Sequence, residues 1–431
     1  MNAVQLLCTA DVHLGRRPSG LPAGTDTATH SPRVGLEQVV DTAIQRGVDA
    51  VVVAGDLVDR ERRYAEAYGV VEQAADTLDA AGVAFVCVAG NHDYDVLPRL
   101  ADDIDGLQLL GRNGEWEQTT VETDGVELRL DGWSFPRRHW RESPLASGGF
   151  DNVSSGDGTP RVGVVHADTS GADRYAPIDG EELATTGHDA WLLGHLHSPG
   201  HRQETPPVLY PGSLQPLDRT ETGRHGAWEL RVDRDGTVTT DRLTTATVQF
   251  ESVTVSTSPS DDFADVVDTV HQRVRDRAVE QVVGADLFVA DLTVKGRTDA
   301  HAVLLDRQRE LLEVELVEAG TTLRVGEVSV ETTPAVDLTD RAGEDDPVGF
   351  LAGLLRALDE ETDASAEPYR DLIASAHDRL RETHESNAYR ELRHHDDDYE
   401  RPTEVDARRH LRRQARRLLD RFLAQEGGEQ S

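Results

Sequence analysis

Five short, valine-rich apolar runs constrain most strongly what this chain can fold into. None of them alternates between apolar and polar residues, so each is typical of a strand with both faces buried. Helical patterns separate the first three: one begins at Ser31-Pro32 and ends at Gly47, and another covers residues 63–81. This strand–helix order predicts an α/β fold. The runs are residues 4–10, 48–55, 83–90, 161–167 and 188–194.

Weaker patterns complete the predicted organisation of the chain. Strands over 117–123, 126–134 and 208–216, and a hairpin over 226–243, extend the first domain to residues 1–245. Residues 246–335 alternate strand and helix patterns and predict a small α+β domain. Residues 336–431 are charged and helical. The Gly/Ser/Asp-rich segment 141–160 predicts an exposed, mobile loop.

Charge and cysteine content limit the functional classes. The chain has 80 acidic and 44 basic residues, a net charge of −36. Because its apolar runs are too regular for disorder, we interpret this excess as adaptation to molar salt, where the Debye length falls to about 3 Å. It resembles the composition of proteins from salt-accumulating archaea. Cys8 and Cys87 lie within apolar runs and are expected to be free thiols. No run is long enough for a membrane span, and a cytoplasmic location is expected.

Each of the five apolar runs ends in residues that bind metals. The carboxyl ends of the strands in an α/β sheet are where ligands gather. A single histidine or aspartate at one strand end is usually structural, but five in succession predict a metal site. Since the ligands are carboxylate, amide and imidazole without thiolate, they suit Mn, Fe or Zn. They are too many for one ion and match a pair of ions about 3.5–4 Å apart. The residues are Asp11, His13, Asp56, Asn91, His92, Asp93, His166, His195 and His197.

These motifs, D-X-H, G-D, G-N-H-D, H and G-H-X-H in this order, resemble those of the calcineurin-like metallophosphoesterase superfamily. The resemblance implies a metallophosphoesterase β-sandwich flanked by helices, with a small α+β capping domain and a helical C-terminal tail. The segments TADVHLG, GDLVDR and YPGS resemble those of SbcD-type DNA repair nucleases more closely. This implies an Mn-dependent exonuclease or endonuclease that acts on DNA, dimerises, and works with an SbcC-type coiled-coil ATPase.

The resemblance also implies a role for each residue. One ion would be held by Asp11, His13, Asp56 and His197, and the other by Asp56, Asn91, His166 and His195, with Asp56 shared. His92 would act on the scissile phosphate, and Asp93 would support its loop or orient it. Asp59 is a departure, because archaeal relatives tend to carry a histidine there and bacterial ones an aspartate. It leaves the polarity of cleavage and the balance of exonuclease and endonuclease activity open.

Two other functions stay open at this point. A phosphoesterase acting on a small nucleotide or phosphate ester would use the same metal site, although the added domains argue against it. A non-catalytic DNA-binding scaffold would not need the complete ligand set together with His92.

The last helical pattern, over 403–425, has Leu411, Ala415, Leu418 and Phe422 on one face and seven arginines around them. It predicts either a helix packed on its own protein or a docking helix for the ATPase or for DNA phosphates. The stretch His394-His395, with the acidic residues after it, is interpreted as a solvated linker.

Overall fold

The computed structural model describes residues 3–59, 64–154, 158–169, 175–202, 205–281, 284–335, 338–360, 367–386 and 402–428. Contacts divide the chain into two units. The first comprises Met1–Val253, His271–Leu292 and Leu312–Glu327, and the second comprises Thr254–Val270, Thr293–Leu311 and Val328–Ser431. The boundary between these units runs through the small α+β region, so the domain limits proposed from the sequence stay a prediction.

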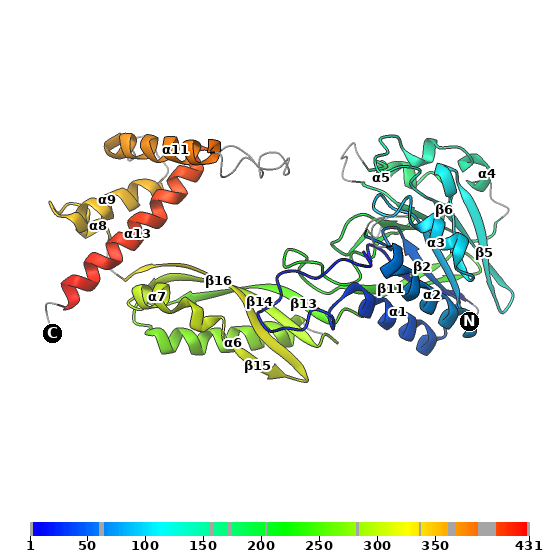
Figure 1. The fold of residues 1–431 in the computed structure, drawn as a ribbon, viewed down its shortest axis with the longest axis horizontal. Coiled ribbons are helices and arrows are strands. Elements are labelled where there is room, and N and C mark those ends of the chain that lie inside the picture. The colour runs from blue at the N-terminus through cyan, green and yellow to red at the C-terminus, as the bar shows by residue number, and fades with distance from the viewer. Residues whose placement is uncertain are drawn as a thin grey trace. The chain divides into compact units, whose positions relative to one another are not determined.

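The first unit contains two six-stranded sheets (Figure 1). In the first sheet, the order is β12-β11-β1-β2-β3-β4. Its parallel strands are β1 (Ala3–Thr9), β2 (Ala50–Ala54), β3 (Ala84–Val88) and β4 (Leu107–Leu109). In the hairpin of β11 (Gly226–Asp233) and β12 (Val238–Thr244), β11 pairs antiparallel with β1, and β12 pairs antiparallel with β11. This hairpin confirms the prediction for residues 226–243.

The second sheet has the order β5-β6-β7-β8-β10-β9. Strands β6 (Val126–Trp133), β7 (Arg161–His166), β8 (Ala190–Gly194) and β10 (Val208–Tyr210) are parallel. The edge strands β5 (Glu117–Thr123) and β9 (Gly200–Arg202) are antiparallel to their neighbours. The five apolar runs are therefore strands, but they belong to two sheets: β1, β2 and β3 lie in the first, and β7 and β8 in the second.

Buried side chains between the two sheets form the central core. Leu6 on β1, Val52 on β2, Leu130 on β6 and Val164 on β7 belong to one buried cluster. Each fully buried valine or leucine contributes about 1.5–3 kcal/mol relative to an exposed one. The other face of the first sheet packs against α1 (Pro32–Arg46), α2 (Tyr64–Ala80) and α3 (Leu97–Asp103). This arrangement is the helix-flanked β-sandwich predicted from the sequence.

Helix α1 illustrates how local sequence sets its limits. It begins at Pro32, as predicted, and ends at Gly47, which adopts a φ of 64° that favours glycine. Ser31 does not cap the helix with its side chain as expected. Its hydroxyl donates instead to the carbonyl oxygen of Ala28, 2.8 Å away.

A third sheet, ordered β13-β14-β16-β15, accounts for the small α+β region. Its strands are β13 (Val248–Thr257), β14 (Leu287–Thr298), β15 (Glu315–Glu318) and β16 (Thr321–Pro334), with helices α6 (Phe263–Gln281) and α7 (His301–Leu311). Strand β15 was not predicted, because four residues give too short a pattern. It pairs with β16 in an antiparallel hairpin.

The C-terminal region of the second unit is a small helical bundle. It contains α8 (Leu338–Arg341), α9 (Pro347–Glu360), α11 (Arg370–Glu385) and α13 (Glu404–Gly428), in agreement with the predicted helical character of this region. Leu355, Ile373, Ala415 and Leu419 are buried in its core. The predicted apolar face was partly wrong, since Leu418 is 44 % exposed and its neighbour Leu419 is buried.

Two further sequence interpretations can be compared with the structure. The predicted loop 141–160 contains short helical turns at Pro144–Ala146 and at α4 (Phe150–Ser154). Because Pro144 and Val153 are buried, this segment is not exposed throughout. The stretch around His394 and His395 lies outside the described residues.

The remaining short helices are Arg112–Gly114, α5 (Gly180–Leu183) and Glu367–Tyr369. Within the described part of the chain, no helix has the length and apolar character to span a membrane.

Candidate metal centre

Both sheets deliver metal-binding side chains to the same place. Asp11 follows β1, Asp56 follows β2 and Asn91 follows β3, while His166 ends β7 and His195 follows β8. Parallel registers align these ends: Ala54 pairs with Val88, and His166 pairs with Gly194. The carboxyl ends of two separate sheets therefore meet at one buried cluster, although the sequence alone indicated a single edge.

The backbone at the strand ends is strained in a way that aims the side chains. Asp11, His13, Asp56 and His195 have φ values of 47°, 51°, 51° and 90°. Residues other than glycine seldom adopt positive φ, and such strain concentrates at functional sites. Four strained residues in one cluster indicate that the surrounding fold holds these side chains for a function.

The glycines before the ligands act in two different ways. Gly55 has a φ of 90°, so it provides a sharp turn directly before Asp56. Gly90 and Gly194 do not have positive φ, so glycine is not required at these two positions by a turn. A Cβ atom on Gly90 would overlap the Asp56 carboxylate, and one on Gly194 would overlap the carbonyl of Ala54. These two glycines permit close approach of the strand ends.

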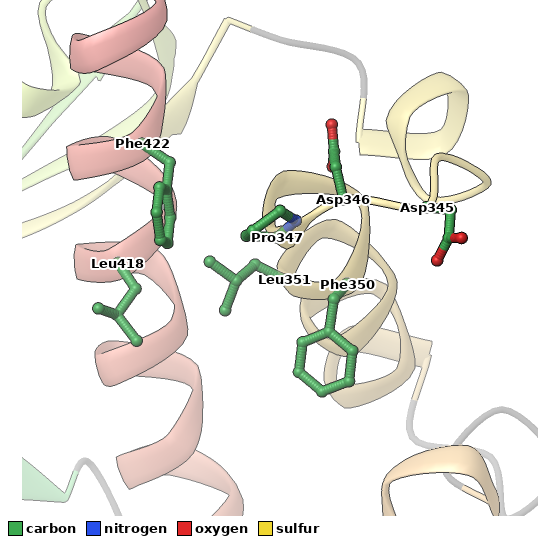
Figure 2. A pocket seen from close by; sticks show the side chains of 7 residues that line it. All are labelled: Asp345, Asp346, Pro347, Phe350, Leu351, Leu418 and Phe422. Atoms are coloured by element: carbon green, nitrogen blue, oxygen red, sulfur yellow. The ribbon is translucent and has the colours of Figure 1, made fainter.

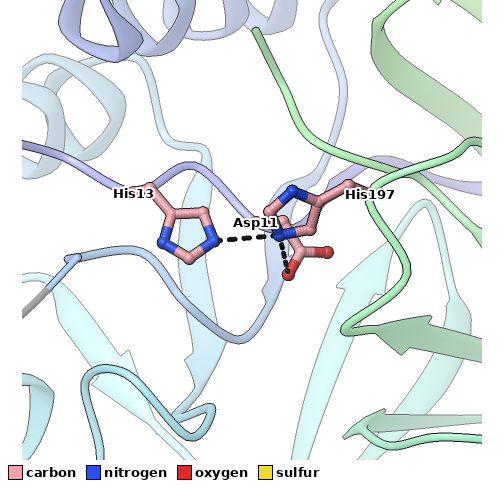
Figure 3. Close-up of side chains that lie close together, drawn as sticks. All are labelled: Asp11, His13 and His197. Carbon is pink, nitrogen blue, oxygen red and sulfur yellow. Dashed lines mark hydrogen bonds and ion pairs between the residues drawn. The ribbon is translucent and has the colours of Figure 1, made fainter. Parts of the chain in front are cut away.

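One group of candidate ligands consists of Asp11, His13 and His197 (Figure 3). The Nε2 atoms of His13 and His197 face each other 3.2 Å apart. The Nε2 atom of His197 lies 3.8 Å from Oδ1 of Asp11, and that of His13 lies 3.8 Å from Oδ2 of Asp56. These are the four residues expected for the first ion, and the structure brings them together.

A second group surrounds His166. Its Nε2 atom lies 3.4 Å from Oδ2 of Asp56 and 3.0 Å from Oδ1 of Asn91. Asp11, Asp56 and His166 form a second set of potential ligands. The ring of His195 lies edge-on to His166, with ring centroids 5.3 Å apart. Asp56 therefore lies near histidines of both groups, and Asp11 is a member of both.

Hydrogen bonding shows that these residues fit a cation. Nδ1 of His166 donates to the carbonyl of Ala54 at 3.1 Å, which leaves a lone pair on Nε2 of the neutral ring. That lone pair faces the Oδ1 atom of Asn91, which is also an acceptor. Two buried acceptors at 3.0 Å repel each other unless a cation lies between them or a proton is added. A divalent ion satisfies both.

The electrostatics of the site point the same way. Burial raises the pKa of the Asp11 carboxyl group to about 6, and the Asp56 charge adds to this effect. Burial lowers the pKa of His195 to about 4, so its ring is neutral and can bind a metal. Buried carboxylates beside neutral imidazoles provide the negative charge and lone pairs that divalent cations require.

His92 and Asp93 have distinct environments on the loop after β3. Nδ1 of His92 donates to the carbonyl of Asp59 at 2.9 Å, and the Asp59 carboxylate lies 3.7 Å from the same atom. The Asp93 carboxylate instead accepts the backbone N–H groups of Gly90 at 2.8 Å and Val58 at 3.2 Å. Asp93 supports the loop, and Asp59 orients His92. The sequence signal for Asp59 was its position three residues after Asp56.

Glu221 is a functional residue that the sequence did not reveal. Nδ1 of His197 donates to its Oε1 atom at 2.7 Å. The other oxygen accepts the Ser213 hydroxyl at 2.5 Å and the Leu217 N–H at 3.0 Å. Burial alone would lower the pKa of His197 and raise that of Glu221. The contact between the two side chains outweighs burial, so the pKa of His197 is raised to about 9 and that of Glu221 is lowered to about 2. A carboxylate behind a ligand histidine fixes the ring orientation.

Replacing Glu221 is expected to weaken metal binding without unfolding the domain. In Glu221→Gln, the amide keeps the side-chain shape but cannot hold His197 with a charge-assisted hydrogen bond. We expect the affinity for a divalent ion to fall by about ten- to a hundred-fold. Calorimetric titration of the metal-free protein with Mn²⁺ measures this, with the exposed Glu122→Gln as a matched control. Equal affinities in the two variants would show that Glu221 has no role at the site.

Comparison with known proteins agrees with this geometry. Residues 4–199 match the calcineurin-like phosphoesterase family, and residues 250–333 match the middle domain of metallophosphoesterase YhaO. Residues 4–199, somewhat less than half of the chain, are therefore similar to the calcineurin-like phosphoesterase family. This family's fold implies divalent metal ions, for which the strand-end cluster supplies the ligands.

Three relatives illustrate the range of similarity. The chain is 27 % identical to the uncharacterized metallophosphoesterase YhaO of Bacillus subtilis over 46 % of its length and 48 % of the relative's. It is 28 % identical to the DNA double-strand break repair protein Mre11 of Aeropyrum pernix, over 54 % of this chain and 58 % of that one. Mre11 of Methanopyrus kandleri is 25 % identical over 85 % of both chains. With the first two relatives, the chain thus aligns over about half of their length.

Proposed function

We propose that this protein is a metal-dependent DNA nuclease subunit that hydrolyses phosphodiester bonds during DNA end processing and double-strand-break repair. The observation that carries the proposal is the meeting of two candidate ligand groups that share Asp11 and that both lie within reach of Asp56, with the partly exposed His92 beside them. Similarity to Mre11 proteins supports DNA as the substrate.

The residues of the chain divide the work in the proposed reaction. Two bound divalent ions, proposed to be Mn²⁺, would polarise the phosphate and activate water for in-line attack. Because Nδ1 of His92 donates to the Asp59 carbonyl, Nε2 is the ring atom available to the substrate. Protonated His92 would donate from Nε2 to the leaving 3′-oxygen or stabilise its charge. Asp93 holds the loop that positions His92.

A panel of substrates tests this proposal. The Mn²⁺-loaded protein is incubated with duplex DNA, single-stranded DNA, a simple aryl phosphodiester and nucleotide monoesters. The proposal predicts hydrolysis of DNA and of the diester, with little turnover of monoesters. Fast turnover of a nucleotide or phosphate monoester without DNA cleavage would overturn it in favour of a small-molecule phosphoesterase. Binding of DNA without hydrolysis of any ester would indicate a scaffold.

Further features of the proposal rest on the resemblance to SbcD-type nucleases. They include a homodimer. A cytoplasmic location and a high-salt environment are proposed from the sequence itself, and the net charge of −36 supports the high-salt environment. An SbcC-type coiled-coil ATPase is the proposed partner. The helical bundle offers it an apolar groove of 510 Å³ between α9 and α13. The groove is lined by Asp345, Asp346, Pro347, Phe350, Leu351, Leu418 and Phe422.

Figure 2 shows Leu418 and Phe422 projecting from α13 toward Leu351 on α9. Phe350 is 55 % exposed at the edge of this groove. An amphipathic helix of the ATPase would bury these side chains. The paired carboxylates of Asp345 and Asp346 at the rim favour a basic residue on that helix.

The variant Phe350→Asp is expected to abolish binding of the ATPase subunit, since it places a charge in the apolar contact. Hydrolysis of a simple phosphodiester should remain, because the groove contains none of the proposed metal ligands. Co-purification of the two subunits measures the first effect. The matched control is Val279→Asp, at an apolar residue 69 % exposed on α6. Retained binding by Phe350→Asp would contradict this groove as the contact.

A further inference from the structure

Helix α13 bears two stripes of opposite character. Its apolar stripe, which includes Ala415 and Leu419, is buried against α9 and α11. A second stripe consists only of arginines at spacings of three and four residues, so they project from one side of the helix. We call it the arginine stripe: Arg409, Arg412, Arg413, Arg416 and Arg417.

The arginine stripe lines a cleft within the second unit. The cleft has a volume of 620 Å³, within the range of about 300–1,000 Å³ that holds ligands. Its opposite wall comes from α7 and β16, where Gln308, Ser329 and Thr332 contribute neutral polar groups. Of the lining residues in the described part of the chain, Glu331 alone carries a carboxylate. The lining is therefore strongly cationic in a chain whose total charge is −36.

Among the residues that the structure describes, part of this positive charge has no ion-pair partner. Arg409 forms an ion pair with Asp406 at 3.3 Å, and Arg412 with Asp359 at 2.9 Å. Arg413 and Arg417 are exposed, and within the described ranges neither forms an ion pair. Like charges four residues apart on a helix repel each other. An anionic ligand in the cleft would remove that repulsion.

We propose that the arginine stripe binds the phosphodiester backbone of duplex DNA, which rests on the proposed nuclease function. Guanidinium groups form bidentate hydrogen bonds with phosphate oxygens. From Arg409 to Arg417, the stripe spans about 12 Å of helix, which matches roughly three to four phosphates along one strand.

The side chains of the cleft favour contact with the DNA backbone over contact with the nucleotide bases. Proteins that hold single-stranded nucleic acid stack its bases on aromatic side chains. The described residues that line the cleft include no Phe, Tyr or Trp. Backbone contacts of this kind position a duplex without selecting its sequence. The arginine stripe is therefore a sequence-independent duplex contact, separate from the metal centre in the first unit.

The double variant Arg413→Gln/Arg417→Gln tests this inference in the full-length protein. Glutamine retains helix propensity, and both positions are exposed, so the fold should be kept. Affinity for a labelled duplex is measured by fluorescence anisotropy over a series of KCl concentrations in which circular dichroism shows a folded protein. Each phosphate contact contributes about 0.9 to the slope of log K against log salt concentration. We expect the slope to fall by about 1.8 and binding at 0.1 M KCl to weaken roughly fifty-fold.

The control Arg379→Gln/Arg381→Gln removes the same charge from exposed positions on α11. A loss confined to Arg413→Gln/Arg417→Gln supports the inference. An unchanged slope, or an equal loss of DNA affinity in both double variants, overturns the inference. The first result would indicate that the stripe binds an acidic protein surface instead, and the second would indicate a general effect of charge. Hydrolysis of a simple phosphodiester should be unchanged in both. If the wild type binds and cuts no DNA, the proposed function itself fails, which is a distinguishable result.

Discussion

The variant Asp56→Asn is expected to lose the second metal ion and nearly all hydrolytic activity. The Asp56 carboxylate stands between the two ligand groups, 3.8 Å from Nε2 of His13 and 3.4 Å from Nε2 of His166. The asparagine amide has nearly the same size as the carboxylate. It can still accept the hydrogen bond from the backbone N–H of His92, which is 2.9 Å long in the wild type, but it carries no charge to share between two cations. Loss of one Lewis acid costs several kcal/mol of transition-state stabilisation, or about a thousand-fold in rate.

Two measurements check the Asp56 prediction. Metal analysis after dialysis gives the number of bound ions, and hydrolysis of a simple phosphodiester gives the rate. The exposed Asp79→Asn on α2 removes one carboxylate elsewhere and should behave as wild type. Full metal content and activity in Asp56→Asn would rule out a shared carboxylate at this position.

The variant His92→Gln is expected to lose catalysis while keeping its metals. His92 is held by the Asp59 carbonyl and has 24 % of its side chain exposed toward solvent, where a substrate can reach it. It belongs to neither of the two ligand groups that include Asp11, although with His13 and Asp59 it forms a third set of potential ligands. Removing a positioned proton donor lowers kcat by about a hundred- to ten-thousand-fold. Calorimetry with Mn²⁺ should show wild-type affinity.

A comparison with His139→Gln controls for the loss of an imidazole, because His139 lies beside Tyr175 and is not among the candidate ligands. The leaving group provides a second check on the role of His92. A substrate whose leaving group is already acidic needs no protonation, so His92→Gln should be least impaired with it. Equal loss for good and poor leaving groups would contradict a proton-donor role, and loss of metal binding would instead make His92 a ligand.

Much of the first unit could be predicted because its signals are local. The valine-rich runs and the Ser31-Pro32 and Gly47 signals gave strands and a helix within one or two residues of their observed limits. The Asp, Asn and His residues of the candidate metal centre also follow directly after these runs. Because ligands bind at the carboxyl ends of strands, this position was enough to predict that these residues lie close together. Their assignment to individual ions and to catalysis stays a prediction.

Other features depend on contacts between distant parts of the chain. Glu221 lies 24 positions after His197, with strands β9 and β10 between them, and nothing in the surrounding sequence marks it as a partner. The division of the strands between two sheets depends on pairing partners, which apolar runs buried on both faces do not specify. Leu418 and Leu419 are adjacent apolar residues, and only packing against the neighbouring helices decided which of them is buried.

The central claim is that the strand ends of two sheets form a metal centre with which this chain cuts DNA. Its most direct test is cleavage of duplex DNA labelled at one end, with Mn²⁺ and in high KCl, by the wild type and by His92→Gln. We expect progressive shortening or internal cutting by the wild type, abolished by chelation of the metal and by His92→Gln. DNA left intact by a metal-loaded wild type that still hydrolyses a small phosphodiester would contradict the claim.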